Sequence, residues 1–155
     1  MKKAFTLIEL IVVVTIIGVL LTGGVVSYTS LNKSSRDARR KSDLEQIRAA
    51  LEMYRSTNNF YPAGAGKADN ILGDLIGDPK YIETIPLDPK DAASYIYYYE
   101  SFPAGCDNGS EYCNDYIIAA SLEGASTCDA ISVDCVTDPT PSSCNYCLGP
   151  YGQKQ

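Results

Sequence analysis

A long run of residues without charge lies near the start of this chain and limits what it can fold into. Residues 10–32 are 23 residues without Asp, Glu, Lys or Arg, and one carboxylate, Glu9, comes directly before them. About 20 apolar residues in an α-helix cross a bilayer core of about 30 Å. An ordinary secretory signal has a shorter apolar region, roughly 7–15 residues, and then a small-residue cleavage site. The run therefore predicts an N-terminal helix of membrane length, and its simplest interpretation is a plain membrane anchor.

Glu9 and the short basic leader at Lys2 and Lys3 go beyond what a plain anchor needs. A charged side chain within a membrane helix costs about 2.5–3.5 kcal/mol on insertion scales, so such a residue usually has a function and a partner. Residues 2–10 read KKAFTLIEL. This segment resembles, almost residue for residue, the N-terminal signal of type IV pilins and type II secretion pseudopilins.

The resemblance implies a defined maturation and assembly pathway. A prepilin peptidase cleaves after Ala4, Phe5 is N-methylated, and the subunits assemble through the N-terminal helix with the help of Glu9 and Thr6. Cleavage creates an amine at Phe5, four residues before Glu9, so the carboxylate of one subunit can pair with the amine of the next. The chain departs from the family pattern in two places: Ala4 stands where most members have Gly, and no proline interrupts the apolar segment.

Lys2 and Lys3 also set the expected topology. The positive-inside rule places the N-terminus in the cytoplasm and the bulk of the chain outside. The precursor is then a single-pass inner-membrane protein, and the assembled product is an extracytoplasmic or cell-surface filament. The implied partners are the prepilin peptidase, an inner-membrane assembly platform, membrane lipid and identical subunits in a helical filament.

The charge of the chain is divided unevenly. Residues 1–55 hold nine Lys and Arg against five Asp and Glu, whereas residues 56–155 hold four Lys against fourteen Asp and Glu. The acidic second part is a poor candidate for binding duplex DNA by itself, so no direct contact with nucleic acid is expected. The chain has no His and no recognisable catalytic or phosphate-binding motif, so we expect no enzyme activity and no cofactor.

Two interpretations fit the basic cluster of Arg36, Arg39, Arg40 and Lys41. It forms either a solvated face of the helix next to the membrane or an electrostatic contact with the acidic domain of a neighbouring subunit. The first interpretation is the simpler one.

All six cysteines lie in the last 50 residues, in the part predicted to be outside. An even number of Cys in an oxidising compartment predicts three disulfides, with 15 possible pairings. The short spacings favour Cys106–Cys113 and Cys128–Cys135. Cys144 and Cys147 form a C-x-x-C that is also found in redox and zinc sites, but structural disulfides are the preferred interpretation.

The periodicity predicts an α+β fold in which one long helix packs on a small antiparallel sheet. Leu44, Ile47, Leu51 and Tyr54 repeat at spacings of three, four and three, which is one face of a helix that continues to residue 57. The expected parts of the chain are a leader at 1–4, a transmembrane and assembly helix at 5–32, an amphipathic helix at 33–58, and a globular pilin domain with a Cys-rich C-terminal region at 59–155.

Within the globular part, aromatic and β-branched residues predict strands at Ser94–Glu100 and Asp115–Glu123, and a weaker one at 131–136. Tyr97 and Tyr99 then share one face of the first strand and pack on the helix, while Tyr98 lies on the other face. The remaining expectations are a short helix at Asn70–Ile76 capped by Asp69 and an irregular tail from Thr137 onward.

The series Tyr61-Pro62, Ile85 to Pro89 and Tyr95-Ile96-Tyr97 resembles the YP…PxDP…YxY pattern of major G-type pseudopilins, up to about residue 100. Members of that group often bind calcium through acidic loop residues. The candidate oxygen ligands here are Asp107, Asn108, Ser110, Glu111 and Asp115. A solvated acidic loop beside a disulfide is the preferred alternative.

Two functions remain open from the sequence. The first is a structural subunit of a type IV pilus or of a type II secretion pseudopilus. The second is a monomeric, membrane-anchored and disulfide-stapled ectodomain that binds a surface ligand or partner. The second predicts an uncleaved leader and no dependence on Glu9.

Overall fold

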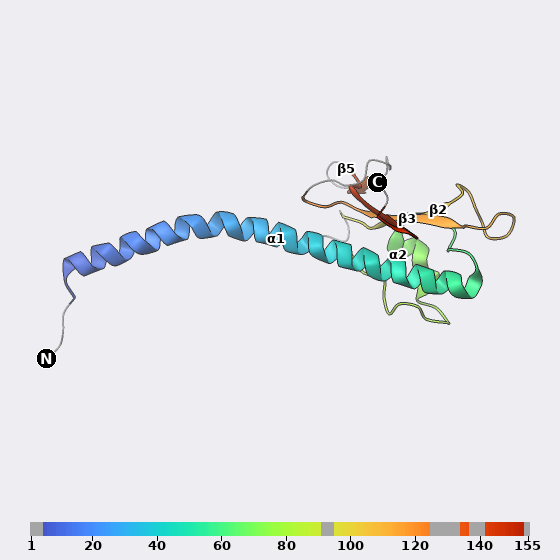
Figure 1. The fold of residues 1–155 in the computed structure, drawn as a ribbon, viewed down its shortest axis with the longest axis horizontal. Helices are drawn as coiled ribbons and strands as arrows, with labels where there is room; N and C mark the ends of the chain where they lie inside the picture. The colour runs from blue at the N-terminus through green and yellow to red at the C-terminus, as the bar shows by residue number, and fades with distance from the viewer. Residues whose placement is uncertain (1–4, 91–94, 125–133, 137–141, 154–155) are drawn as a thin grey trace. The chain divides into compact units, whose positions relative to one another are not determined.

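The computed structural model describes residues 5–90, 95–124, 134–136 and 142–153. The chain divides into two compact units, residues 1–35 and 36–155. The fold is α+β, as the sequence predicts, with one long helix and a five-stranded antiparallel sheet (Figure 1).

The helix α1 spans Leu7–Asn58 and belongs to both units. In the second unit its predicted stripe is confirmed: Leu44, Ile47 and Leu51 are fully buried, and Tyr54 packs at the margin of the core. The helix ends where Asn59 takes a left-handed conformation with φ of 68°, a common device at helix C-termini. Over the described residues, no helix is both long enough and apolar enough to cross a membrane.

The sheet places its strands in the order β1, β2, β3, β6, β7, and every neighbouring pair is antiparallel. The strands are β1 (Ala65–Lys67), β2 (Tyr98–Phe102), β3 (Asp115–Ala120), β6 (Tyr146–Gly149) and β7 (Gly152–Gln153). A separate two-stranded sheet pairs β4 (Asp134–Val136) with β5 (Ser142–Ser143).

Several predicted strands need correction. The strand predicted at Ser94–Glu100 begins at Tyr98 instead, and β3 ends at Ala120 rather than Glu123. The weak strand predicted at 131–136 corresponds to β4, with 131–133 outside the described residues. The tail predicted to be irregular supplies β6 and β7 to the main sheet. All four residues of β6 are buried, so its sequence shows no alternation of apolar and polar residues.

The short helix predicted at Asn70–Ile76 also differs in detail. It consists of α2 (Ala68–Ile71) followed by a 3₁₀ helix, η1 (Leu72–Leu75). Asp69 does not cap it, because the N-cap residue is Lys67, and Asp69 instead forms an ion pair with the Lys67 ammonium at 3.1 Å.

The core of the second unit lies between α1 and the sheet and is rich in tyrosine. Tyr97 and Tyr99 belong to this core, whereas Tyr98 packs against a smaller cluster with Ala119 on the other face, as the alternation predicts. Tyr99 and Tyr116 are fully buried and their rings stack at 6.1 Å. The Tyr99 hydroxyl donates to the carbonyl of Pro62 at 2.7 Å, which gives its polar end a partner.

Candidate functional site

Thr6 and Glu9 form a capping box at the first turn of α1. Oε2 of Glu9 accepts hydrogen bonds from the Thr6 amide and the Thr6 hydroxyl, both at 2.8 Å. In return, Oγ1 of Thr6 accepts the Glu9 amide at 3.3 Å. A T-x-x-E sequence at a helix start satisfies two otherwise unpaired amides in this way. The Glu9 carboxylate therefore has a partner in its own chain, and the T-x-x-E pattern of residues 6–9 is the sequence signal for it.

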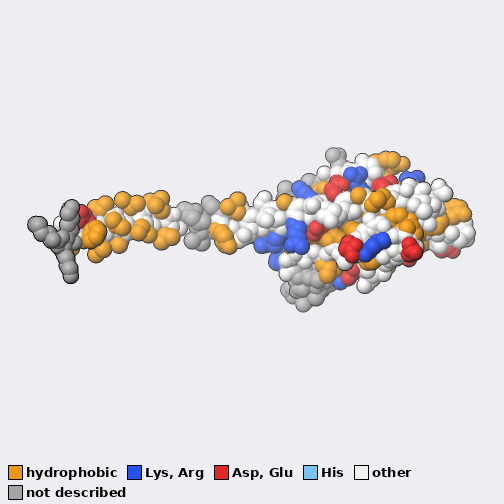
Figure 2. Space-filling view, turned by 90° about the horizontal axis from the view of Figure 1, so that it is seen from below, with side chains coloured by type: hydrophobic (Ala, Val, Ile, Leu, Met, Phe, Trp, Pro, Cys, Tyr) orange, Lys and Arg blue, Asp and Glu red, His pale blue; other side chains and the backbone are white. Residues whose placement is uncertain are grey.

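The large apolar side chains of the described part of the first unit are exposed, and Figure 2 shows them along the visible face of the helix. Phe5, the residue expected to become the N-terminus, is 90% exposed. Ala4 lies outside the described residues. A helix that is apolar all round is normally buried in lipid or against other proteins. Large exposed side chains in this stretch are Leu7, Ile8, Leu10, Ile11, Val12, Val13, Val14, Ile16, Ile17, Val19, Leu20 and Leu21.

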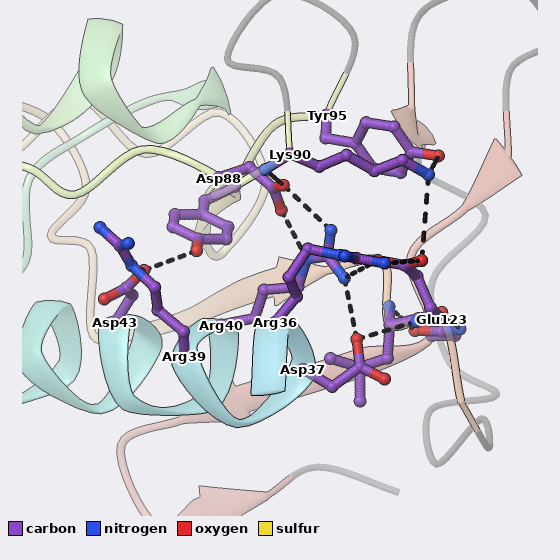
Figure 3. Close-up of polar contacts among 12 residues, drawn as sticks. Arg36, Asp37, Arg39, Arg40, Asp43, Asp88, Lys90, Tyr95 and Glu123 are labelled. Atoms are coloured by element: carbon purple, nitrogen blue, oxygen red, sulfur yellow. Dashed lines mark hydrogen bonds and ion pairs between the residues drawn. The ribbon is translucent and has the colours of Figure 1, made fainter. Parts of the chain in front are cut away.

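A second constellation lies at the start of the second unit and is centred on Arg40 (Figure 3). The Arg40 side chain is fully buried and makes a bidentate pair with Asp88, at 2.7 and 3.0 Å. Nη1 of Arg40 also donates to Asp37 at 2.8 Å and to Glu123 at 3.2 Å. Burial disfavours the charged guanidinium, but these carboxylates more than offset it and raise the pKa of Arg40.

Arg36 extends this network toward the end of β3. Its guanidinium makes a bidentate pair with Glu123, at 2.6 and 2.7 Å. Asp37 accepts the backbone amides of Glu123 and Gly124, both at 2.9 Å. One turn of α1 thus holds both the loop that contains Asp88 and the segment after β3.

These contacts correct our interpretation of the basic cluster. Arg36 and Arg40 form ion pairs with carboxylates of their own domain. They therefore belong neither to a solvated helix face nor to a contact with a neighbouring subunit. Only Arg39 and Lys41 of the cluster are exposed. Asp88 and Glu123, two of the three partners of Arg40, lie 48 and 83 residues away in sequence, so no local pattern indicates them.

Asp43 and Tyr97 add one buried contact beside this network. The Tyr97 hydroxyl donates to the Asp43 carboxylate at 2.8 Å. Burial, together with this carboxylate, raises the pKa of Tyr97, so the phenol remains a donor. The contact ties the residue directly before β2 to α1.

The stability of the second unit should depend on pH through Glu123. The hydrogen bond from Arg36 is the main reason why the pKa of Glu123 is lowered, from 4.5 to about 2, and Arg40 and Lys90 add to it. A carboxylate with a lowered folded-state pKa stabilises the fold above its unfolded pKa, and this contribution is lost as the pH falls through the folded pKa. We expect a loss on the order of 3 kcal/mol between about pH 5 and pH 2.

Thermal unfolding of the full chain across this pH range measures the effect. Glu123→Gln should be less stable than wild type at pH 6, and the difference should shrink toward pH 2. The matched control is Glu83→Gln, because the Glu83 carboxylate is 85% exposed; its difference from wild type should stay near zero. If the stability difference between Glu123→Gln and wild type stays constant from pH 6 to pH 2, ionisation of Glu123 is not the source of the pH dependence.

Two of the calcium candidates, Asp107 and Asn108, form hydrogen bonds with groups of the protein itself. Asp107 accepts the amides of Gly109, Ser110 and Glu111, at 2.7–3.3 Å, and these bonds lower the pKa of its carboxyl to about 2. Asn108 bridges the Tyr61 carbonyl and the Cys113 amide, both at 2.8 Å. In the part of the chain that the structure describes, no three His, Cys, Asp or Glu side chains are grouped to hold a metal ion. Asp115 lies at the start of β3.

Disulfides are present in the Cys-rich region. Cys106 and Cys113 are joined, with their Cα atoms 5.3 Å apart. Cys144 and Cys147 are disulfide-bonded as well, as the structural interpretation of their C-x-x-C expects, so neither sulfur is a free thiolate for a zinc ion. The side chains of Cys128 and Cys135 lie outside the described residues, so their pairing with each other stays a prediction.

The N-terminal segment that contains the Thr6–Glu9 capping box also matches a known protein family. The family described as "Prokaryotic N-terminal methylation motif" matches residues 1–25. The chain is 31% identical over 96 residues to type II secretion system core protein G of Pseudomonas aeruginosa, covering 57% of this chain and 68% of that protein. It is 32% identical over 97 residues to the proteins of the same name from Aeromonas hydrophila and Klebsiella pneumoniae, covering 67% and 69% of them. No solved structure gives a significant match. The chain belongs to the family of type II secretion system core protein G, the pseudopilins.

Proposed function

We propose that this chain is a structural subunit of a type II secretion pseudopilus or of a type IV pilus, assembled through its N-terminal helix. The observation that carries the proposal is the Thr6–Glu9 capping box at the start of an apolar helix, inside the matched methylation motif. The family consists of structural proteins, and we infer no catalytic role.

Maturation would follow the motif residue by residue. Prepilin peptidase cleaves between Ala4 and Phe5 and leaves a free amine, which is methylated. Residues 1–4 are then the leader, residues 5–32 the membrane and assembly segment, and the rest an extracytoplasmic domain. In support, residues 10–32 hold no charge and the leader carries Lys2 and Lys3.

The capping box gives Glu9 a role both before and during assembly. In the single subunit, its Oε2 is held by Thr6, which lowers the cost of placing a carboxylate in lipid. Oε1 accepts no hydrogen bond from the described residues, so it remains available for the amine of Phe5 in a neighbouring subunit. A subunit in the wrong register leaves that amine unpaired, which disfavours incorrect packing.

Electron microscopy of sheared surface fractions tests this proposal. The full chain is produced together with a prepilin peptidase and an assembly platform of the same type. We expect filaments that antibodies against this chain label along their length. Labelled membrane without filaments, under conditions in which a known pseudopilin of that system assembles, would favour the monomeric ectodomain.

A further inference from the structure

Tyr28 stands alone as an aromatic residue in the N-terminal half of α1. No Phe, Tyr or Trp lies between Phe5 and Tyr28, and none lies between Tyr28 and Tyr54. Tyr28 belongs to the first unit and is 67% exposed, so the described part of that unit leaves its ring uncovered. An exposed ring that carries a hydroxyl suits surroundings that are apolar on one side and wet on the other.

The sequence changes in polarity at Tyr28. Residues 10–27 hold no charge and are mostly apolar, whereas residues 29–35 read TSLNKSS. Lys33 in this polar stretch is exposed, and it takes part in none of the ion pairs found among the described residues. A tyrosine and a lysine that end an apolar segment are typical of the boundary between hydrocarbon and lipid headgroups, because each has an apolar body and a polar tip.

The length of helix between Glu9 and Tyr28 matches the thickness of a bilayer core. Tyr28 lies 19 residues after Glu9 on one continuous helix, Leu7–Asn58. This length spans about 29 Å, against about 30 Å for the hydrocarbon core. With Tyr28 at the outer interface, the Glu9 carboxylate reaches the cytoplasmic interface, where a charge costs less than at the bilayer centre. Lys33 lies about 7.5 Å further along the axis, at the level of the lipid phosphates.

We propose that Tyr28, with Lys33 behind it, anchors the membrane segment in the outer headgroup layer and thereby holds the Ala4–Phe5 bond at the depth where the prepilin peptidase cleaves it. This inference rests on the proposed function, because it requires a precursor inserted in a membrane. Phe5 precedes the first residue of α1 by two positions, so it lies just beyond the inner end of the matched length. Tyr28 is thus a positioning residue for cleavage, and its partner is the lipid surface.

Fluorescence quenching measures the depth of Tyr28 directly, because the chain contains no Trp. Single-tryptophan variants of the full chain are placed in vesicles of phosphatidylethanolamine and phosphatidylglycerol that carry bromine either near the acyl carbonyl or near the chain end. Tyr28→Trp should be quenched most by bromine near the carbonyl, and Leu20→Trp most by bromine at the chain end. Met53→Trp, in the second unit, should respond only to dissolved iodide.

Moving the tyrosine along the helix tests the effect on cleavage. The double variant Tyr28→Leu/Leu31→Tyr keeps the composition but shifts the anchor by about 4.5 Å along the axis. Because a misplacement of about 1 Å can cost about 10²-fold in rate, purified prepilin peptidase should cleave this variant at least about tenfold more slowly than wild type. Tyr28→Trp keeps an interfacial aromatic and should be cleaved as wild type is. The matched control is Ser30→Leu/Leu31→Ser, which leaves Tyr28 and Lys33 in place and should also be cleaved normally.

Two results would overturn the inference and leave the proposed function standing. One is a tryptophan in Tyr28→Trp that is quenched most by chain-end bromine or by iodide. The other is cleavage of Tyr28→Leu/Leu31→Tyr at the wild-type rate. A wild-type chain that the peptidase does not cleave at all would instead contradict the proposed function itself.

Discussion

Replacing Glu9 by Ala should reduce filament assembly at least about tenfold without unfolding the second unit. The change removes the carboxylate that accepts Thr6 and, in the proposed assembly, the amine of Phe5 in the next subunit. Charge-assisted hydrogen bonds in a low dielectric are worth about 1.5–3 kcal/mol each, and about 1.4 kcal/mol corresponds to a factor of ten. Quantitative immunoblotting of sheared filaments against total protein measures the effect.

Two variants separate the charge of Glu9 from its shape. Glu9→Gln keeps the hydrogen bond to Thr6 but not the charge, so it should assemble at a level between wild type and Glu9→Ala. Glu45→Ala removes an exposed glutamate from the same helix, which pairs with Arg48 at 2.7 Å, and should assemble normally. If Glu9→Ala filaments form with the yield and length of wild-type filaments, Glu9 has no role in assembly.

Replacing Arg40 by Ala should destabilise the second unit by about 3–5 kcal/mol, because it leaves buried carboxylates without their counter-charge. Asp88 would lose both of its bonds to the guanidinium, and Asp37 and Glu123 would lose one each. For a chain of this length the expected fall in Tm is on the order of 10 °C. Denaturant or thermal unfolding of the full chain in detergent, followed by near-ultraviolet absorption of its buried tyrosines, provides the measurement.

Arg39→Ala is the matched control, because it removes the adjacent arginine, which is mostly exposed and only weakly paired. Its effect on stability should stay below about 0.5 kcal/mol, as is usual for exposed positions. Equal losses from the two variants would mean that the Arg40 network contributes nothing specific to the fold.

The features that the sequence predicted well are local ones. The segment from Ala4 to Leu10 is contiguous, and the stripe from Leu44 to Tyr54 follows helical spacing over three turns. The alternation of Tyr97, Tyr98 and Tyr99 likewise predicted that Tyr97 and Tyr99 join the main core and that Tyr98 packs elsewhere, although β2 itself begins at Tyr98. In each case the residues that determine the structure are neighbours in sequence.

The features that the sequence missed depend on distant partners. β6 is a buried strand of four residues, and it is too short to show a strand pattern while its Gly weakens the strand propensity. β1 has the sequence Ala-Gly-Lys, which has low strand propensity. It forms a strand because its backbone pairs with the edge of β2. Arg40 looks like its basic neighbours in the sequence, and only the fold brings Asp88 and Glu123 to it.

The mass of the N-terminal peptide of this chain, isolated from sheared filaments or membranes of the native host, tests the central claim most directly. The account predicts a peptide that begins at Phe5 and carries one methyl group on its amine, despite Ala4 at the cleavage site. A peptide that still contains Met1 to Ala4 in all of the protein would contradict the account and favour an anchored, monomeric ectodomain.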